Sequence, residues 1–111
     1  MDRLSNYRQI IRSTLKPYID IIYANVNVKN RAAFDSETDQ YIILSEGWDH
    51  QRHLHSILLH LEIVNGKVWV QYDGTEDGIT DELLKAGIPK EEIVLGFHEP
   101  EVRLHTGFAI A

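Results

Sequence analysis

The chain has no cysteine, no long apolar run and only three prolines among its 111 residues. Without thiols there is no disulfide, iron–sulfur cluster or cysteine nucleophile, and any metal would depend on His, Asp and Glu. No apolar run approaches the roughly 20 residues that span a bilayer, and residues 1–7 lack the apolar stretch of a secretory signal. We therefore expect a cytoplasmic protein with no membrane association. We also expect a single domain over residues 1–111, because a chain of this length encloses one modest core.

The formal net charge of −6 is distributed unevenly along the chain. Residues 1–31 hold six basic and two acidic side chains, whereas residues 32–111 hold five basic and fifteen acidic ones, a net charge of −10. Such an acidic surface repels nucleic-acid phosphates, which disfavours sequence-independent coating of DNA. The charge distribution indicates another protein as the better-matched partner.

Apolar residues near the N-terminus follow the spacing of one helix face. They are Leu4, Tyr7, Ile11, Leu15, Tyr18 and Ile22. Pro17 interrupts this pattern, because its ring clashes with the preceding turn and it has no N–H, so we expect a kink or two shorter helices. Another face carries basic side chains, which we call the N-terminal basic residues: Arg3, Arg8, Arg12 and Lys16. They are candidate nucleic-acid contacts or simply a solvated helix face.

The strongest strand signals lie on either side of Asn65-Gly66. A type I′ turn needs positive φ at both central positions, which these residues tolerate. With a two-residue loop, Glu62 faces Trp69 and Leu59 faces Tyr72. One side of the hairpin then carries Ile57, Leu59, Leu61, Ile63, Val68, Val70 and Tyr72, and the other carries Leu58, His60, Glu62, Trp69, Gln71 and Asp73. We expect the first side to face the core.

Two further strands are expected before this hairpin, over residues 25–34 and 41–44, with a break at residues 47–50. Thr80 is the expected N-cap of a short helix near residues 79–86. The segment from Val94 onward is too apolar to be disordered, so we expect it to pack on the domain or on a second copy. The fold class is therefore α+β, with an N-terminal helix, a mainly antiparallel sheet of about four strands, a short helix and an apolar C-terminal segment.

An aromatic and polar set is the candidate contact surface, because Trp69 lies opposite Glu62 on the less apolar side of the sheet. Its members are Trp48, Arg52, His60, Trp69 and Gln71. Trp and Arg are favoured at the centres of protein interfaces, where a large flat group loses water while its polar edge finds a partner. The alternative is that helices cover this face and that Trp69 belongs to the core.

The acidic loop after the hairpin suggests chemistry without defining an active site. Asp73 and Glu76 could act as paired carboxylates, or they could satisfy backbone donors around the next helix. No nucleophile elbow, phosphate-binding loop or dinucleotide motif accompanies them, so we assign no catalytic residue. The six histidines do not share the spacing of a metal site, and we expect neither a metal nor a cofactor.

Blocks of residues along nearly the whole chain form a family pattern. They are Tyr7, Phe34-Asp35, Tyr41, Gly47-Trp48, Arg52, Gly66-Lys67, Trp69, Gln71, Asp73, Thr75-Glu76, Leu83, Gly87-Ile88-Pro89, Ile93-Val94-Leu95, Phe97, Arg103, Thr106 and Phe108-Ala109. With these blocks the chain resembles the XisI-like family, the fdxN element excision controlling factors of cyanobacteria. The resemblance implies control of the developmentally regulated excision of a DNA element in heterocyst-forming cells, alongside a site-specific recombinase and a companion protein, XisH.

The leading hypothesis is a non-enzymatic accessory factor that controls DNA excision through contacts with a XisH-like partner. Asp73 and Glu76 join the aromatic and polar set as interaction candidates. A DNA-binding subunit that uses the N-terminal basic residues is the second hypothesis. A hydrolase or nuclease centred on the same two carboxylates is the third. The apolar C-terminal segment also predicts a homo-oligomer.

Overall fold

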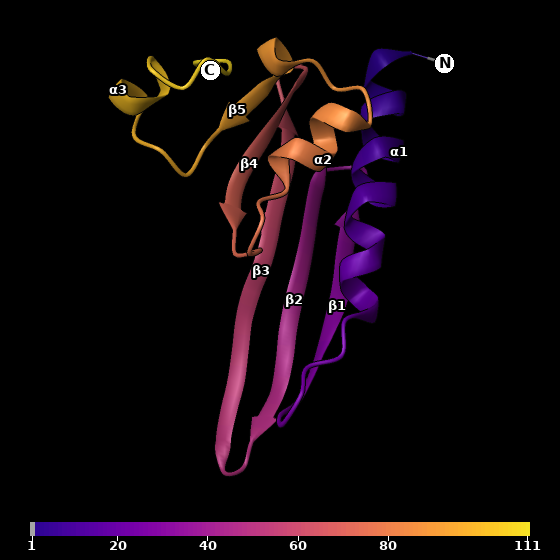
Figure 1. Cartoon of the computed structure of the whole chain (residues 1–111). Coiled ribbons are helices and arrows are strands. Elements are labelled where there is room, and N and C mark those ends of the chain that lie inside the picture. The colour runs from indigo at the N-terminus through magenta and orange to yellow at the C-terminus, as the bar shows by residue number, and fades with distance from the viewer. Residues whose placement is uncertain (1) are drawn as a thin grey trace.

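The computed structural model describes residues 2–111, in which helices pack on a five-stranded sheet (Figure 1). The strands lie in the order β1-β2-β3-β4-β5, and all neighbours are antiparallel except β4 and β5, which are parallel. In chain order the elements are α1 (Arg3–Leu15), the 3₁₀ turn η1 (Lys16–Asp20), β1 (Asn27–Asp35), β2 (Gln40–Asp49), β3 (Arg52–Val64), β4 (Lys67–Asp73), α2 (Thr80–Lys85), the 3₁₀ turn η2 (Lys90–Glu92), β5 (Ile93–Leu95) and α3 (Pro100–Arg103). The predicted α+β class is confirmed, with one strand more than expected.

The opening helix buries one stripe of its surface. The Asp2 carboxylate caps it by accepting a hydrogen bond of 2.8 Å from the Ser5 amide. Tyr7, Ile11 and Leu15 are buried, each contributing about 1.5–3 kcal/mol of apolar burial. The helix ends at Leu15 and continues only as η1, which confirms the interruption predicted from Pro17. Because the helix does not continue, Ile22 is 93% exposed, and its predicted place in the stripe is wrong.

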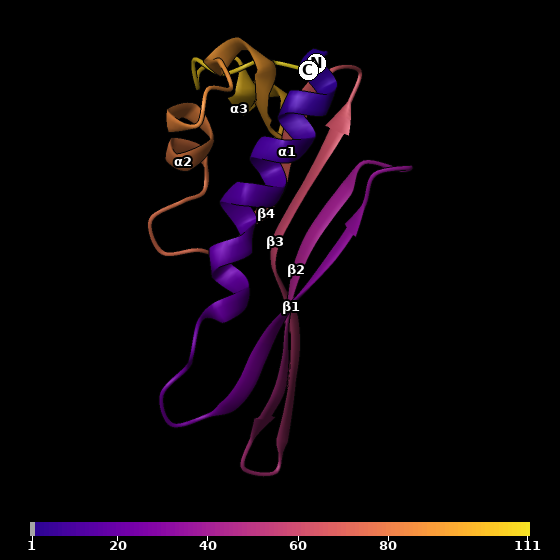
Figure 2. The ribbon, with the colours of Figure 1, turned by 90° about the vertical axis from the view of Figure 1, so that its right-hand side faces the viewer.

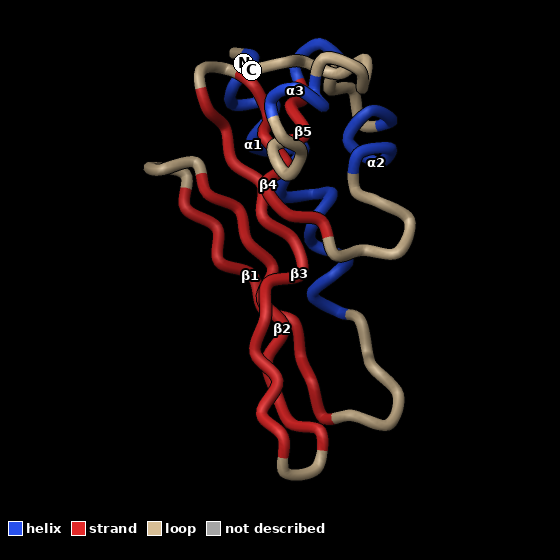
Figure 3. Tube along the Cα trace, turned by 90° about the vertical axis from the view of Figure 1, so that its left-hand side faces the viewer, coloured by secondary structure: helices blue, strands red, loops and turns tan. Residues whose placement is uncertain are grey.

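The two faces of the sheet have different surroundings. Helices α1 and α2 lie on the same side, which we call the front face, and Figures 2 and 3 show β1, β2 and β3 without a helix on the opposite side, the back face. The core lies between the front face and these helices. It comprises Tyr7, Ile11, Leu15, Tyr41, Ile43, Leu59, Leu61, Ile63, Val68, Val70, Ile79, Leu83, Ile88, Ile93 and Leu95. An α+β domain with one helical layer therefore leaves part of its sheet uncovered.

The predicted reversal at Asn65-Gly66 is present. Asn65 has φ 51° and Gly66 has φ 80°, the positive values that a type I′ turn requires. The register from the turn outward also matches the prediction as far as Leu61 opposite Val70. The turn chemistry therefore sets the alignment of the central hairpin.

Two bulges then change which side chains face the core. Leu58 has no partner in β2, because Ile43 pairs with Leu59 and Leu44 pairs with Ile57. Gln71 has no partner in β3, because Leu61 pairs with Val70 and His60 pairs with Tyr72. A bulge inserts one residue and reverses the inside/outside alternation beyond it.

The bulges correct two sequence predictions. Ile57 and Tyr72 were expected in the core, yet they are 41% and 51% exposed, because each lies beyond a bulge. The predicted pairing of Leu59 with Tyr72 is likewise wrong by one residue, and Leu59 lies opposite Asp73. Asp73 consequently points toward the front face, away from His60 and Trp69.

Other differences from the expected elements are local. The expected break at residues 47–50 is wrong for Gly47 to Asp49, which continue β2, and the chain turns at His50-Gln51. The additional strand is the short β5. Its three residues are all apolar and buried, and they pair with β4 in parallel. Ile79, not Thr80, is the N-cap of α2, and its amide donates to Asp73 Oδ2 over 2.7 Å.

The C-terminal segment packs on the domain, as one of the two expected arrangements. Ala109 bridges to Val94, and the Lys67 ammonium donates to the Ala111 carbonyl oxygen over 2.8 Å. Self-association stays a prediction, motivated by four exposed apolar side chains of this segment: Phe97, Val102, Leu104 and Ile110. Among residues 2–111, none of the helices combines the length and apolar character needed to cross a bilayer.

The close approach of β1 to Gly47 generates a stability prediction. A Cβ added to Gly47 would lie 1.9 Å from the Asn27 carbonyl oxygen and 2.7 Å from the Val28 Cα. Backbone atoms cannot move away by a change of rotamer, as the end of a side chain can. We therefore expect Gly47→Ala to lower the free energy of unfolding, measured by urea denaturation, by about 1–3 kcal/mol.

Gly96→Ala is the matched control for this substitution. Its added Cβ would first meet the end of the flexible Gln71 side chain, at 2.6 Å. We expect a smaller loss than at Gly47. Equal losses at the two glycines would contradict the close packing of β1 on β2.

Candidate functional site

The back face presents a patch of partly exposed apolar side chains. Ile42 and Leu44 come from β2, Ile57 from β3 and Tyr72 from β4. Leu44 pairs directly with Ile57, while His60 lies between Ile42 and Tyr72 in the register. We call Ile42, Leu44, Ile57 and Tyr72 the back-face patch. Within residues 2–111 no helix covers it, which makes it a surface suited to contact with another protein.

A hydrogen-bonded polar network borders the back-face patch. His60 Nε2 lies 2.6 Å from Gln40 Oε1, and the Gln40 amide donates to Glu62 Oε2. The Gln71 amide donates to Glu62 Oε1 over 2.6 Å. The network therefore links β2, β3 and β4, and both oxygens of the Glu62 carboxylate accept from neutral amides. Such a network fixes the orientation of its members, including the sequence candidates His60 and Gln71.

Trp69 lies next to this network and is half-buried. Its cover comes from the C-terminal segment, because the Arg103 guanidinium lies 5.1 Å from the indole centroid. Arg103 Nε also donates to the His98 carbonyl oxygen over 3.0 Å, which holds the guanidinium in place. A Cβ on Gly96 would lie 3.0 Å from the indole, so glycine at this position allows the loop to pass close to Trp69. The indole is thus neither a free surface nor a core residue beneath α1.

Trp48 and Arg52 lie elsewhere, at the tip of the β2–β3 hairpin. Trp48 is 49% exposed and its ring centroid lies 4.7 Å from that of His53. Arg52 is exposed and lies 3.8 Å from the Asp49 carboxylate. Seven residues of extended strand separate His53 from His60, about 23 Å. The structure therefore divides the aromatic and polar set, bringing His60, Trp69 and Gln71 together and leaving the other two apart.

The two carboxylates of the acidic loop have different environments. Asp73 accepts from the Thr75 amide at 3.0 Å, the Thr75 hydroxyl at 2.5 Å and the Ile79 amide at 2.7 Å. It organises the loop and the start of α2, in the manner of an Asx turn. Glu76 is exposed and lies in a pocket on the front face. The structure does not bring these carboxylates together with His60 or Arg52.

Three of the N-terminal basic residues have partners inside the domain. Arg3 lies 2.8 Å from the Glu92 carboxylate, and the Arg12 guanidinium lies 5.9 Å from the Tyr41 ring centroid. Arg8 donates to both oxygens of Asp39, at 2.7 and 3.2 Å. Lys16, the fourth, forms neither an ion pair nor a cation–π contact within residues 2–111. The two ion pairs, of Arg3 and Arg8, reduce the positive charge that a DNA phosphate would meet.

The Arg8–Asp39 pair shifts the pKa of both of its members. The hydrogen bonds from Arg8 lower the pKa of Asp39, and the Tyr41 hydroxyl, at 3.1 Å, adds to the effect against the opposing cost of burial. The same bonds raise the pKa of Arg8. Asp39 has φ 55°, so the residue also accommodates the tight turn before β2. This pair joins α1 to the sheet.

The sequence contained a signal for one of the two bulges. Ile57, Leu58 and Leu59 are three consecutive apolar residues in a strand that otherwise alternates, and such a run is compatible with an inserted residue. Around Gln71 the alternation of Val70 and Tyr72 is regular, and no local pattern announces the second bulge. Tyr72 and Ile57 were therefore missed as surface residues.

Comparison with known proteins decides the family. The chain matches the family described as XisI protein over residues 1–110. The chain belongs to the XisI family. A structure of the fdxN element excision controlling factor XisI from Anabaena variabilis ATCC 29413 is 43% identical, with a TM-score of 0.85, and the match covers 99% of this chain and 100% of that one. The comparison with curated proteins gives no match.

A second solved structure supports the fold. It is a XisI-like protein from the same organism, 24% identical, with a TM-score of 0.86 and coverage of 99% of this chain and 100% of that one. The resemblance predicted from the residue blocks is thus confirmed. The 43% identical relative is named as a controlling factor of fdxN element excision. Within residues 2–111 no three His, Asp or Glu side chains are grouped to hold a metal ion.

The Arg8–Asp39 pair yields a pH prediction. Because the folded-state pKa of Asp39 is lowered, its stabilisation is present above pH 4 and is lost as the pH falls through the folded value. Asp39→Asn keeps a residue that tolerates positive φ. We expect it to lower the free energy of unfolding by about 1 kcal/mol at pH 7, and the difference from wild type should shrink below pH 4.

Chemical denaturation at several pH values measures this difference. Asp20→Asn, at an exposed position, is the control and is expected to change stability by less than about 0.5 kcal/mol. A difference for Asp39→Asn that is unchanged at pH 2.5 would show that the charge of this carboxylate does not stabilise the fold.

Proposed function

We propose that this member of the XisI family is a non-enzymatic controlling factor for DNA-element excision that acts through protein contacts. Its partner is a basic, XisH-like protein, within a site-specific recombination system. The observation that carries the proposal is the uncovered back face, with an apolar patch beside a rigid polar network. Apolar side chains supply affinity when they lose water, and an ordered polar border supplies specificity.

The charge of the chain supports a basic partner. Residues 32–111 carry a net charge of −10, and the N-terminal basic residues are mostly engaged in contacts within the domain. Opposite charge accelerates the encounter of two proteins and suppresses wrong partners. DNA, which is itself strongly negative, is disfavoured by the same charge.

The geometry of the polar side chains supports a role without catalysis. Asp73 is engaged by backbone and hydroxyl donors, and the Glu62 carboxylate by two amides. His60, the histidine nearest the back-face patch, is held against Gln40. An acid–base catalyst needs a side chain that reaches a substrate proton, and these groups are directed at their protein neighbours.

Substitution of the back-face patch tests the proposal. A charge placed at the centre of an apolar contact loses its hydration on binding, so Ile57→Glu and Tyr72→Glu, made separately, should each weaken binding to a XisH-like protein at least about 10-fold. The affinity is measured by calorimetry or surface plasmon resonance after co-purification of the wild-type pair. Circular dichroism checks that each variant is folded.

Ile22→Glu is the matched control, since Ile22 is another exposed isoleucine and lies outside the back face. It carries the same change in charge and should bind as the wild type does. Failure of the wild-type proteins to associate would refute the partner. Unchanged binding of both patch variants would refute the surface.

A further inference from the structure

A pocket on the front face is separate from the back-face patch. It has a volume of about 300 Å³, at the small end of the range for ligand sites. Its lining comes from η1 and the segment after it, from β3 and from the acidic loop: Tyr18, Ile21, Tyr23, Leu58, Gly74, Thr75, Glu76 and Asp77. This volume suits one side chain or one small molecule.

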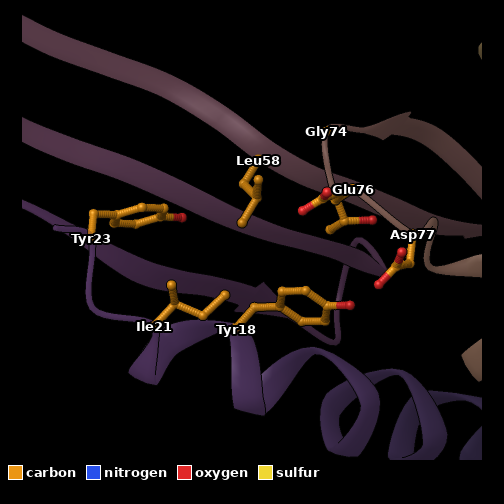
Figure 4. A pocket seen from close by; sticks show the side chains of 8 residues that line it. Tyr18, Ile21, Tyr23, Leu58, Gly74, Glu76 and Asp77 are labelled. Carbon is orange, nitrogen blue, oxygen red and sulfur yellow. The ribbon is translucent and has the colours of Figure 1, made fainter.

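The β3 bulge helps to build this pocket. Because Leu58 is the inserted residue, its side chain points to the front face, where Figure 4 shows it across from Tyr18 and Ile21. The Gly74 amide donates to the Leu58 carbonyl oxygen over 2.7 Å, which ties the acidic loop to the bulge. Bulges next to binding sites re-aim side chains, and this one supplies an aliphatic wall.

The opposite wall is held by a buried asparagine. Asn30 is 5% exposed, and its amide donates to the Tyr18 carbonyl oxygen at 2.6 Å and to the Tyr23 hydroxyl at 3.0 Å. Its carbonyl oxygen accepts from the Ser45 hydroxyl at 2.5 Å. These bonds fix η1 and the following segment on β1 and β2. The aromatic wall is thus preorganised, which lowers the entropic cost of binding.

The polar end of the pocket is negative. Figure 4 shows the Glu76 and Asp77 carboxylates at the same end as the Tyr18 hydroxyl. Neither carboxylate forms an ion pair with another side chain of residues 2–111. Burial raises the pKa of the Tyr18 hydroxyl. Its hydrogen bond to Glu82 raises this pKa further, and so do the negative charges of Glu82, Asp73 and Asp77. The carboxylates around this phenol therefore create a field that favours a cation.

We propose that this pocket binds one alkylammonium or guanidinium group together with its aliphatic stem. The stem lies between Leu58 and Ile21, and the cation lies beside the Tyr18 ring within reach of Glu76 and Asp77. Aromatic faces attract cations, and lysine or arginine stems pack on apolar surfaces while their charged ends stay hydrated. The group belongs to a free polyamine or to a lysine or arginine of a protein. This inference does not depend on the back-face patch.

Binding of small probes to the isolated chain tests the inference. Butylguanidinium and butylurea have nearly the same shape and differ in charge. We expect butylguanidinium to bind at least about 10-fold more tightly, with chemical-shift changes at Tyr18, Leu58 and Gly74 in NMR titrations. Equal affinity of the two probes, or shift changes elsewhere on the chain, would overturn the proposal.

Charge-matched variants distinguish binding in the pocket from general attraction of a cation to an acidic chain. Glu76→Gln with Asp77→Asn should weaken butylguanidinium binding at least about 10-fold. Glu99→Gln with Glu101→Gln removes the same charge from exposed positions outside the pocket and should leave binding unchanged. An equal loss in the two double variants would show attraction by net charge alone and would refute the pocket.

The source of the cation follows from two further probes. Tighter binding of putrescine than of lysine and arginine blocked at both ends identifies a free polyamine as the ligand. The reverse order identifies a side chain of a protein. Both results support a cation site, whereas binding of neither probe contradicts it.

Discussion

Packing of the α1 stripe on one face of the sheet is the interaction on which the rest of the structure depends. Tyr7, Ile11 and Leu15 are buried against the front face, and α2 extends the same layer. Arg8 reinforces the contact through Asp39 at the turn before β2. With one helical layer, the domain completes its core on one side only. The back face remains available to a partner, and this asymmetry connects the fold to the proposed role of a controlling factor.

Two inserted residues adapt this simple architecture to function. Leu58 moves an aliphatic side chain to the front pocket and turns Ile57 to the back face. The insertion of Gln71 places Tyr72 on the back face. It also places Asp73 on the front face, where its carboxylate accepts a hydrogen bond from the Ile79 amide at the end of the acidic loop. The bulges therefore supply both the apolar patch and part of the pocket. At the Leu58 bulge, the backbone carbonyl oxygen accepts a hydrogen bond from the Gly74 amide, so this group keeps a partner outside the regular strand pairing.

Much of the fold was predictable from local chemistry. The helix stripe, the interruption at Pro17 and the turn at Asn65-Gly66 each depend on residues close in sequence, whose preferences survive in the folded chain. The candidate site was less predictable, because it depends on register far from the turn. A regular alternation placed Tyr72 in the core, and only pairing with β3 reveals the inserted Gln71. The cover on Trp69 also depends on Arg103, 34 positions later, which no local pattern announces.

Thiol labelling of the β4 strand tests the one-sided sheet most directly, since the chain has no native cysteine to interfere. Val70→Cys and Tyr72→Cys lie two residues apart, and a regular strand would place both on one face. The structure predicts rapid modification of the native protein at position 72. At position 70 it predicts modification at least about 100-fold slower, through transient opening alone. Similar rates at the two positions, or slower labelling at position 72, would contradict the open back face.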